Sequence, residues 1–136
     1  PWSQLVYEGR KTVFNFVPCD NEFEKAFAVF LDRAHDVAAF AKLPIAVGFA
    51  FEYLDEAKNL RCYYPDFVAV AADGVHSLLE TKGAETVEVR QKDRAAVLWC
   101  ENATGLSGTT WTYLKIPQQE FERLAPACLG DLAALR

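Results

Sequence analysis

The stretches RCYYPDFVAV (residues 61–70) and VHSLLETK (residues 75–82) are rich in β-branched and aromatic side chains, and turn-forming residues separate them. Two such segments, so close along the chain, predict a β-hairpin. Most of their side chains are apolar and favour burial. The exceptions are Asp66 in the first segment and Glu80 and Lys82 at the end of the second. The fold must therefore place three ionisable groups at the ends of largely buried strands.

The length of the loop decides which side chains lie opposite each other, because neighbouring residues of a strand point to opposite faces. A two-residue turn at residues 73–74 would place Asp66 opposite Thr81. A three-residue loop at residues 72–74, with its final glycine in the left-handed conformation of a G1 bulge, would place Asp66 opposite Glu80. Glycine at the third loop position favours this second register. The further pairs expected on the same face are Val68 with Leu78 and Val70 with His76.

Two carboxylates that face each other at one end of an apolar sheet face repel, and burial strengthens the repulsion. A cation between Asp66 and Glu80 would relieve it, and hard divalent metals with oxygen ligands, above all Mg²⁺, suit such a site. The alternative is structural: Asp66 would cap a strand end, while Glu80 and Lys82 would form a solvated pair at the rim of the sheet. Residue chemistry alone leaves both interpretations open.

The rest of the chain predicts alternating helices and strands around this hairpin. Apolar residues recur at helical spacing from Phe23 to Ala41, so a long amphipathic helix is expected from Asp20 or Asn21 to about Lys42. The other expected elements are a strand at 12–17 that Pro18 ends, a strand at 45–54 that opens a three-stranded meander, a helix at 89–102, a strand at 109–116, a helix at 118–125 and a linker-like tail after Pro126. The predicted order is (β)αβββαβα in a single domain covering residues 1–136.

The chain has 136 residues, of which 51% are hydrophobic, and this is enough for one compact domain with its own core. Its longest apolar stretch, VAAFAKLPIAVGFAF, is interrupted by Lys42 and Pro44, so no membrane span is expected. The cysteines show no CxxC spacing, which favours free, buried thiols in a reducing cytoplasm over a disulfide framework or a zinc site. Because the chain starts at Pro1 and contains no methionine, we expect it to be a fragment of a longer polypeptide.

The pair Pro65-Asp66, a gap of 13 residues and the triplet Glu80-Thr81-Lys82 resemble the signature of the PD-(D/E)XK nucleases, in its strand–turn–strand setting. The similarity covers roughly residues 20–115, through the stretches NEFEKAFAVFLDRAHDVAAFAKLP, YYPDFVAV, LLETKG and QKDRAAVLWCENA. These stretches resemble the C-terminal endonuclease domain of the restriction subunit of type III restriction enzymes and of related helicase–nuclease proteins. The resemblance implies an α/β, restriction-endonuclease-like fold, in which a mixed β-sheet with an αβββαβ core is flanked by helices.

The resemblance also implies a Mg²⁺-dependent DNA endonuclease that hydrolyses phosphodiester bonds, with Mn²⁺ able to substitute. Asp66 and Glu80 would ligate the metal through their carboxylates, and Thr81 would ligate it through its backbone carbonyl. Lys82 would orient and polarise the attacking water. Phosphodiester hydrolysis needs such groups, because charge that develops on the phosphate oxygens must be neutralised while the water is activated.

Members of this family often carry a further carboxylate on the first helix. Glu24 is the best match, with Glu22 as the alternative, although Asn21 and Glu24 also match a capping box that would only start the helix. Lys92 on the second predicted helix is a candidate nucleic-acid contact, but a basic helix face is more often merely solvated. No local Ser, Cys and His pattern indicates a nucleophilic triad.

The net charge of −5 is unusual for a protein that binds nucleic acid unaided, because such proteins mostly carry a basic surface. By the resemblance, an N-terminal ATP-dependent helicase or translocase region of the same chain would hold double-stranded DNA, and a methyltransferase subunit would supply sequence recognition. Two other interpretations stay open. One is a catalytically degenerate nuclease fold that serves as an interaction or structural module, and the other is an RNA or single-strand nuclease of the same superfamily.

Overall fold

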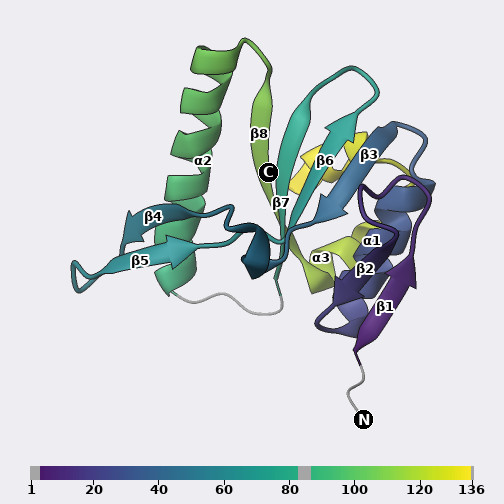
Figure 1. Cartoon of the computed structure of the whole chain (residues 1–136), viewed down its shortest axis with the longest axis horizontal. Helices are drawn as coiled ribbons and strands as arrows, with labels where there is room; N and C mark the ends of the chain where they lie inside the picture. Colours follow the sequence, from purple (N-terminus) through teal and green to yellow (C-terminus); the bar gives the residue numbers. More distant parts are fainter. Residues whose placement is uncertain (1–3, 83–86, 136) are drawn as a thin grey trace.

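A four-stranded mixed β-sheet lies at the centre of the computed structural model, which describes residues 4–82 and 87–135 (Figure 1). Its strands, in spatial order, are β3 (Val37–Lys42), β6 (Phe67–Ala71), β7 (His76–Lys82) and β8 (Trp111–Pro117). β6 is antiparallel to both β3 and β7, whereas β7 and β8 are parallel. A parallel pair needs a crossover between its strands, and here the crossover contains the long helix α2 (Val87–Ser107).

Helix α1 (Glu22–Arg33) covers one face of the sheet and forms the main core with it. The helix begins where the Asn21 side chain accepts a hydrogen bond from the Glu24 backbone nitrogen at 2.9 Å, which satisfies one of the free N–H groups of the first turn. Phe27 and Leu31 of α1 are fully buried against Phe67 and other side chains of the sheet. Helix α3 (Gln118–Leu124) and the 3₁₀ segment η2 (Leu129–Leu135) pack on the same face.

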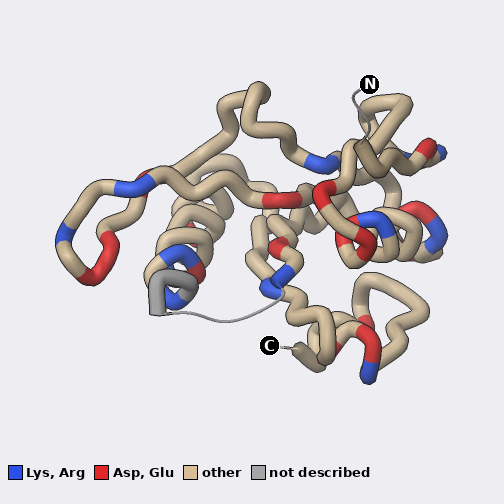
Figure 2. Tube along the Cα trace, turned by 90° about the horizontal axis from the view of Figure 1, so that it is seen from below, with Lys and Arg blue, Asp and Glu red and all other residues tan. Residues whose placement is uncertain are grey.

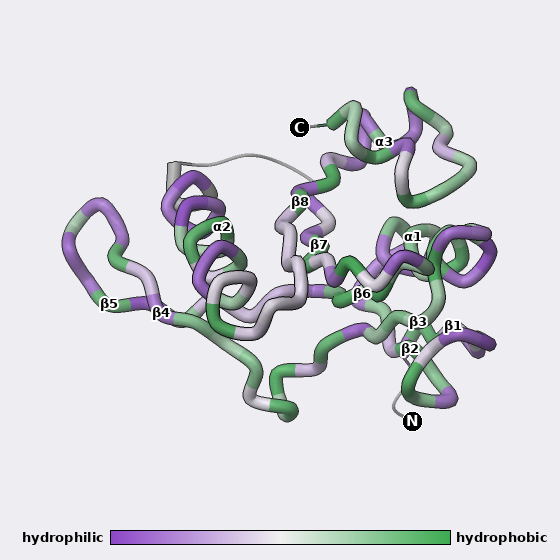
Figure 3. The backbone as a smooth tube through the Cα atoms, turned by 90° about the horizontal axis from the view of Figure 1, so that it is seen from above, coloured by the Kyte–Doolittle hydropathy of each residue, from purple (hydrophilic) through white to green (hydrophobic). Residues whose placement is uncertain are grey.

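The opposite face of the sheet meets α2 and a two-stranded sheet of β4 (Phe51–Leu54) and β5 (Leu60–Tyr63) (Figure 1). A smaller core of Tyr53, Tyr63 and Ala96 lies there. A second two-stranded sheet, β1 (Leu5–Glu8) with β2 (Phe16–Cys19), packs beside α1. Charged residues of both signs are scattered over these elements (Figure 2), and hydrophilic residues dominate the tip of the β4–β5 hairpin (Figure 3).

The predicted fold class and the αβββαβ core are confirmed, as α1, β3, β6, β7, α2 and β8 in chain order. The predicted hairpin register is also confirmed, because Val68 pairs with Leu78 and Val70 pairs with His76. The loop has the predicted bulge: the Gly74 nitrogen donates to the Ala71 carbonyl at 2.9 Å, and the φ of Gly74 is 89°. The prediction succeeded because only glycine adopts this backbone conformation without strain.

The predicted helix up to Lys42 is wrong in its second half. Helix α1 ends at Arg33, the chain becomes extended at Ala34 with ψ of 126°, and residues 37–42 form strand β3. This segment, VAAFAK, is apolar at all positions but the last, so it fits a buried strand as well as a helical stripe. Its apolar residues also match a helical spacing, but pairing with β6 makes the segment a strand.

The predicted meander is wrong in its first two strands. Residues 45–54 form the 3₁₀ turn η1 (Ile45–Val47) and β4, outside the main sheet. Residues 61–70 are divided between β5 and β6, which belong to different sheets. Pro65 stands at the division, and a proline cannot donate to a strand ladder. The first strand of the main sheet is therefore β3.

Three further boundaries differ from the prediction. Instead of a strand at 12–17, β2 spans Phe16–Cys19 and includes Pro18, which a narrow two-stranded sheet accommodates because it consists of edge strands. Helix α2 extends beyond 89–102 at both ends, whereas β8 and α3 lie where they were expected. The tail after Pro126 is not a linker, since it contains η2, whose Leu132 is fully buried in the main core.

None of the helices in the described ranges is long and apolar enough to cross a membrane. All four cysteines are free. Cys19 and Cys100 are buried as predicted, and burial raises the pKa of each thiol to about 11, whereas Cys62 is exposed and Cys128 is intermediate.

Candidate active site

Asp66 lies where the ends of three central strands meet. Its carboxylate Oδ2 accepts hydrogen bonds from the Thr81 backbone nitrogen at 3.1 Å and from the Thr81 Oγ1 hydroxyl at 2.9 Å. Its backbone carbonyl accepts from the Leu43 nitrogen at 2.8 Å, just beyond the end of β3. These bonds hold Asp66 against both neighbouring strands, so its position is set by the sheet and not by a free loop.

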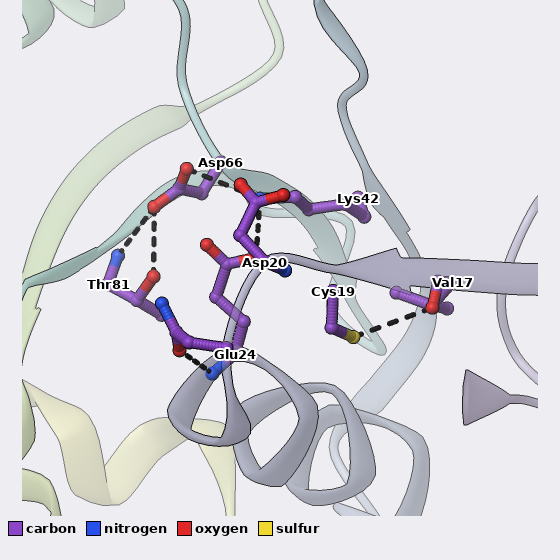
Figure 4. A network of polar contacts seen from close by, with 8 residues as sticks. Val17, Cys19, Asp20, Glu24, Lys42, Asp66 and Thr81 are labelled. Carbon is purple, nitrogen blue, oxygen red and sulfur yellow. Dashed lines mark hydrogen bonds and ion pairs between the residues drawn. The ribbon is translucent and has the colours of Figure 1, made fainter. Parts of the chain in front are cut away.

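Lys42, at the end of β3, lies between Asp66 and helix α1 (Figure 4). Its Nζ is 2.9 Å from Glu24 Oε1 and 3.4 Å from Asp66 Oδ1, and both Lys42 and Glu24 are buried. Burial opposes the charge on the ammonium, but the Asp66 and Glu24 carboxylates, followed by Asp20, outweigh it and raise the pKa of Lys42. The Lys42 side chain is therefore a charged, buried link between the helix and the sheet.

Glu24 has three polar partners: Asp20, Asn21 and Lys42. Its backbone nitrogen donates to the side chain of the N-cap residue Asn21 at 2.9 Å, and its Oε1 accepts from the Asp20 backbone nitrogen at 3.0 Å, so the arrangement resembles a capping box in which the return bond goes to the residue before the N-cap. The same oxygen binds Lys42. The helix-start role of Glu24 and its inward orientation therefore occur together, and neither excludes the other.

Glu80 lies on the α2 side of the sheet, whereas Glu24, Lys42 and Asp66 are joined on the α1 side. The β6–β7 pairing ends at Phe67 with Leu79, one residue short of Asp66 and Glu80. Glu80 Oε2 accepts a hydrogen bond from the Tyr63 hydroxyl at 2.6 Å. Burial, and after it the charge of Asp66, raises the pKa of Glu80 to about 7. The Tyr63 hydrogen bond opposes this rise.

The predicted basic residues lie on the Glu80 side. Lys82 is two residues beyond Glu80 on the same strand face, and the charges of Lys82 and Lys92 both lower the Glu80 pKa. Lys92 of α2 has its ammonium 5.7 Å from the centre of the Tyr63 ring. Behind these groups, the Tyr113 hydroxyl donates to an Asp93 carboxylate oxygen at 2.7 Å.

The structure thus divides the predicted site residues between two clusters. Asp66, Thr81 and Glu24 are joined on the α1 side, with Lys42 between the two carboxylates. Glu80 contacts Tyr63 on the α2 side, and Lys82 shares its strand face. The charge of Asp66 raises the Glu80 pKa, which is an electrostatic link between the two clusters.

The donors are hard oxygens, the ligands that Mg²⁺ prefers, and Mg²⁺ commonly uses only one or two carboxylates together with water. In residues 4–82 and 87–135, no three His, Cys, Asp or Glu side chains are arranged to hold a metal ion. A metal here would therefore depend on Asp66 and Glu80 rather than on a complete protein cage. Burial is the main cause of the raised Glu80 pKa, and the repulsion from Asp66 that adds to it is what a bound cation would relieve.

Sequence reasoning missed Lys42 and Tyr63. The apparent helical spacing places Lys42 at the end of a helix. Had residues 37–42 been recognised as a strand, the alternation from the buried Phe40 would have turned Lys42 toward the core. No comparable signal existed for Tyr63, because Pro65 breaks the alternation between Tyr63 and β6.

A family model described as an endonuclease domain matches residues 10–104, which is more than half of the chain and includes Glu24, Lys42, Asp66 and the Glu80–Lys82 triplet. Comparison with curated proteins and with solved structures found no significant match. The chain belongs to this family of endonuclease domains, and that membership supports a nuclease function.

Proposed function

We propose that this endonuclease domain is a Mg²⁺-dependent DNA nuclease that hydrolyses phosphodiester bonds, and that Mn²⁺ can replace Mg²⁺. One observation carries the proposal: the β6–β7 pairing ends at Phe67 with Leu79, next to Asp66 and Glu80, and burial together with the charge of Asp66 raises the Glu80 pKa to about 7. Two carboxylates in such mutual repulsion suit a divalent cation.

In this proposal Asp66 and Glu80 hold the metal with their carboxylates, and Thr81 adds its backbone carbonyl. When bound, the metal lowers the pKa of a water molecule and neutralises charge on the phosphate oxygens. Lys82 supplies a further positive charge on the Glu80 face, where its ammonium orients the attacking water. Lys92, beside the Tyr63 ring on the same side, contacts a phosphate of the nucleic acid.

The charge distribution supports a domain that is brought to DNA by other parts of a larger protein. The net charge is −5, and the backbone trace shows acidic and basic positions interspersed along the described residues (Figure 2). Because affinity for DNA depends on phosphate neutralisation, the isolated domain is expected to bind duplex DNA weakly. We therefore propose that it is the cleavage module of a type III restriction enzyme or related ATP-dependent helicase–nuclease, acting in the cytoplasm with an N-terminal translocase region and a methyltransferase subunit.

Plasmid cleavage tests the proposal. The chain alone should nick plasmid DNA slowly with Mg²⁺ or Mn²⁺, and the polypeptide that includes the translocase region should cut quickly and only with ATP. Asp66→Ala, Glu80→Ala and Lys82→Ala should each abolish cleavage, leave ATP hydrolysis unchanged and show non-additive effects when combined. Glu101→Gln, which removes an exposed carboxylate of α2, is the control and should cut normally.

Cleavage by the Lys82→Ala variant at the normal rate, with equal ATP hydrolysis, would mean that the domain is a non-catalytic module. Parallel reactions with single-stranded DNA and with RNA determine the substrate class, and faster hydrolysis of either one would overturn the assignment to duplex DNA.

A further inference from the structure

Lys42 is the most deeply buried cation at the candidate site. The exposed fractions of the Lys42, Glu24 and Asp66 side chains are 9%, 6% and 20%. The ammonium also lies 5.3 Å from the centre of the Phe67 ring, so an aromatic side chain adjoins it. Burial of an ammonium in such a place is unfavourable unless carboxylates accompany it, and two of them do.

The individual oxygens of Asp66 have different partners. Oδ2 accepts both hydrogen bonds from Thr81, at 3.1 and 2.9 Å, whereas Oδ1 faces the Lys42 ammonium at 3.4 Å. The oxygen that Thr81 leaves available to a cation is therefore the one that Lys42 occupies. Lys42 is closer to Glu24, at 2.9 Å, so it can leave Asp66 and keep a partner.

The Asp66 cluster is open to small ions from outside the core. A cavity of about 300 Å³ adjoins it, and Asp20, Lys42 and Asp66 contribute the charged groups to its lining. Two carboxylates and one ammonium leave this cavity with a negative charge that attracts cations. A hydrated divalent ion can therefore approach Asp66 through it.

We propose that Lys42 is a positioning residue that acts as an internal counter-ion, holding Asp66 Oδ1 in the metal-free site and competing with the divalent cation for that oxygen. On metal binding the ammonium moves to Glu24 alone. Glu24 thus contributes by retaining Lys42, and it is not itself a metal ligand. This inference rests on the proposed function, in which Asp66 binds the metal.

Calorimetric titration of the chain with MgCl₂ and MnCl₂ tests the inference without any measurement of cleavage. Glu24→Gln weakens the retention of Lys42, which then binds Asp66 more completely, so metal affinity should fall. Lys42→Met together with Glu24→Gln removes a pair with no net charge, and metal affinity should rise by about tenfold, because the competing ammonium is gone. The single Lys42→Met variant should show at least the same rise.

The predicted fall in metal affinity for Glu24→Gln and rise for the double variant distinguish the counter-ion role from a metal-ligand role of Glu24 and from a purely structural role of the pair. If Glu24 were a metal ligand, the double variant would bind metal more weakly than the unaltered chain. If the pair were only structural, the double variant would bind metal with unchanged affinity. Either result overturns the inference. The double variant removes the buried ammonium together with the carboxylate closest to it, and Asp66 keeps its two hydrogen bonds from Thr81, so this variant provides the measurement even if Lys42→Met alone does not fold.

Two controls complete the experiment. Arg123→Met with Glu120→Gln removes an exposed ion pair on α3, again without a change in net charge, and should leave metal affinity unaltered. Asp66→Asn and Glu80→Gln should each abolish binding. Unchanged binding in both would overturn the proposed function and the inference with it, whereas loss in both with no effect of the Lys42 substitutions would overturn the inference alone.

Discussion

Replacing Glu80 with glutamine should stabilise the metal-free protein above neutral pH. In the folded chain burial, and after it the charge of Asp66, raises the Glu80 pKa from its usual 4.5 to about 7. The folded state therefore binds more protons than the unfolded state between these values, and the contribution of Glu80 to stability falls as the pH rises through this window. Glutamine has nearly the same shape, carries no charge and keeps an oxygen for the Tyr63 hydroxyl.

A shift from 4.5 to about 7 corresponds to about 3 kcal/mol, because each pKa unit is worth about 1.4 kcal/mol. We therefore expect Glu80→Gln to raise the free energy of unfolding by about 3 kcal/mol at pH 8, where Glu80 is ionised in both states. At pH 4.5 the gain should be close to zero, since the folded carboxyl is protonated. Mg²⁺ should stabilise the unaltered chain at pH 8 and should have little effect on the variant.

Urea unfolding in the presence of EDTA, at pH 4.5 and at pH 8, measures these differences. Glu101→Gln, with an exposed carboxylate on α2, is the matched control and should change stability equally little at both pH values. A Glu80→Gln gain that is the same at both pH values would refute the reasoning, because it would show that the Glu80 carboxyl does not titrate abnormally.

The other two predictions concern hydroxyl and glycine substitutions. Tyr63→Phe removes the hydrogen bond that lowers the Glu80 pKa, so carbon-13 NMR titration should show Glu80 losing its proton at a higher pH, whereas Tyr64→Phe next to it should have no effect. An unchanged Glu80 titration in Tyr63→Phe would contradict this. Gly74→Ala should lower the free energy of unfolding by about 1–2 kcal/mol, since its φ of 89° strains any other residue. Gly105→Ala in α2, where a methyl group meets nothing within 4 Å, should raise it by about 0.5–1 kcal/mol, and effects of equal sign in urea unfolding would count against the backbone explanation.

The elements predicted correctly are those in which one local rule decides the structure. Glycine at position 74 selects the bulged loop, and the loop length then sets the whole β6–β7 register. Helix α3 lies directly behind Pro117, a residue that favours the start of a helix. The helix start at Asn21 also followed from a local rule, because asparagine is a favoured N-cap residue and its side chain accepts a hydrogen bond from the Glu24 backbone nitrogen.

The elements predicted incorrectly are those decided by tertiary pairing. The run VAAFAK has no local feature that separates strand from helix, and only its pairing with β6 makes it β3. That single error is why Lys42 was missed, because the face to which its side chain points is known only when residues 37–42 are assigned to a strand. The division of residues 61–70 into β5 and β6 likewise depends on tertiary pairing, because the two strands belong to different sheets. The contact between Tyr63 and Glu80 is a product of how those sheets pack, which single-sequence patterns do not contain.

The excursion of the chain between β3 and β6 has an evolutionary consequence. Residues 44–65 leave the main sheet, form η1 and the β4–β5 pair, and return, while β3 and β6 remain hydrogen-bonded neighbours. The length of such a surface insertion costs little free energy, so the four-stranded scaffold tolerates change within it. Yet Tyr63, near its end, touches Glu80. Mutation in this segment can therefore change the pKa of Glu80 during evolution, while Asp66 and the strands of the main sheet stay the same.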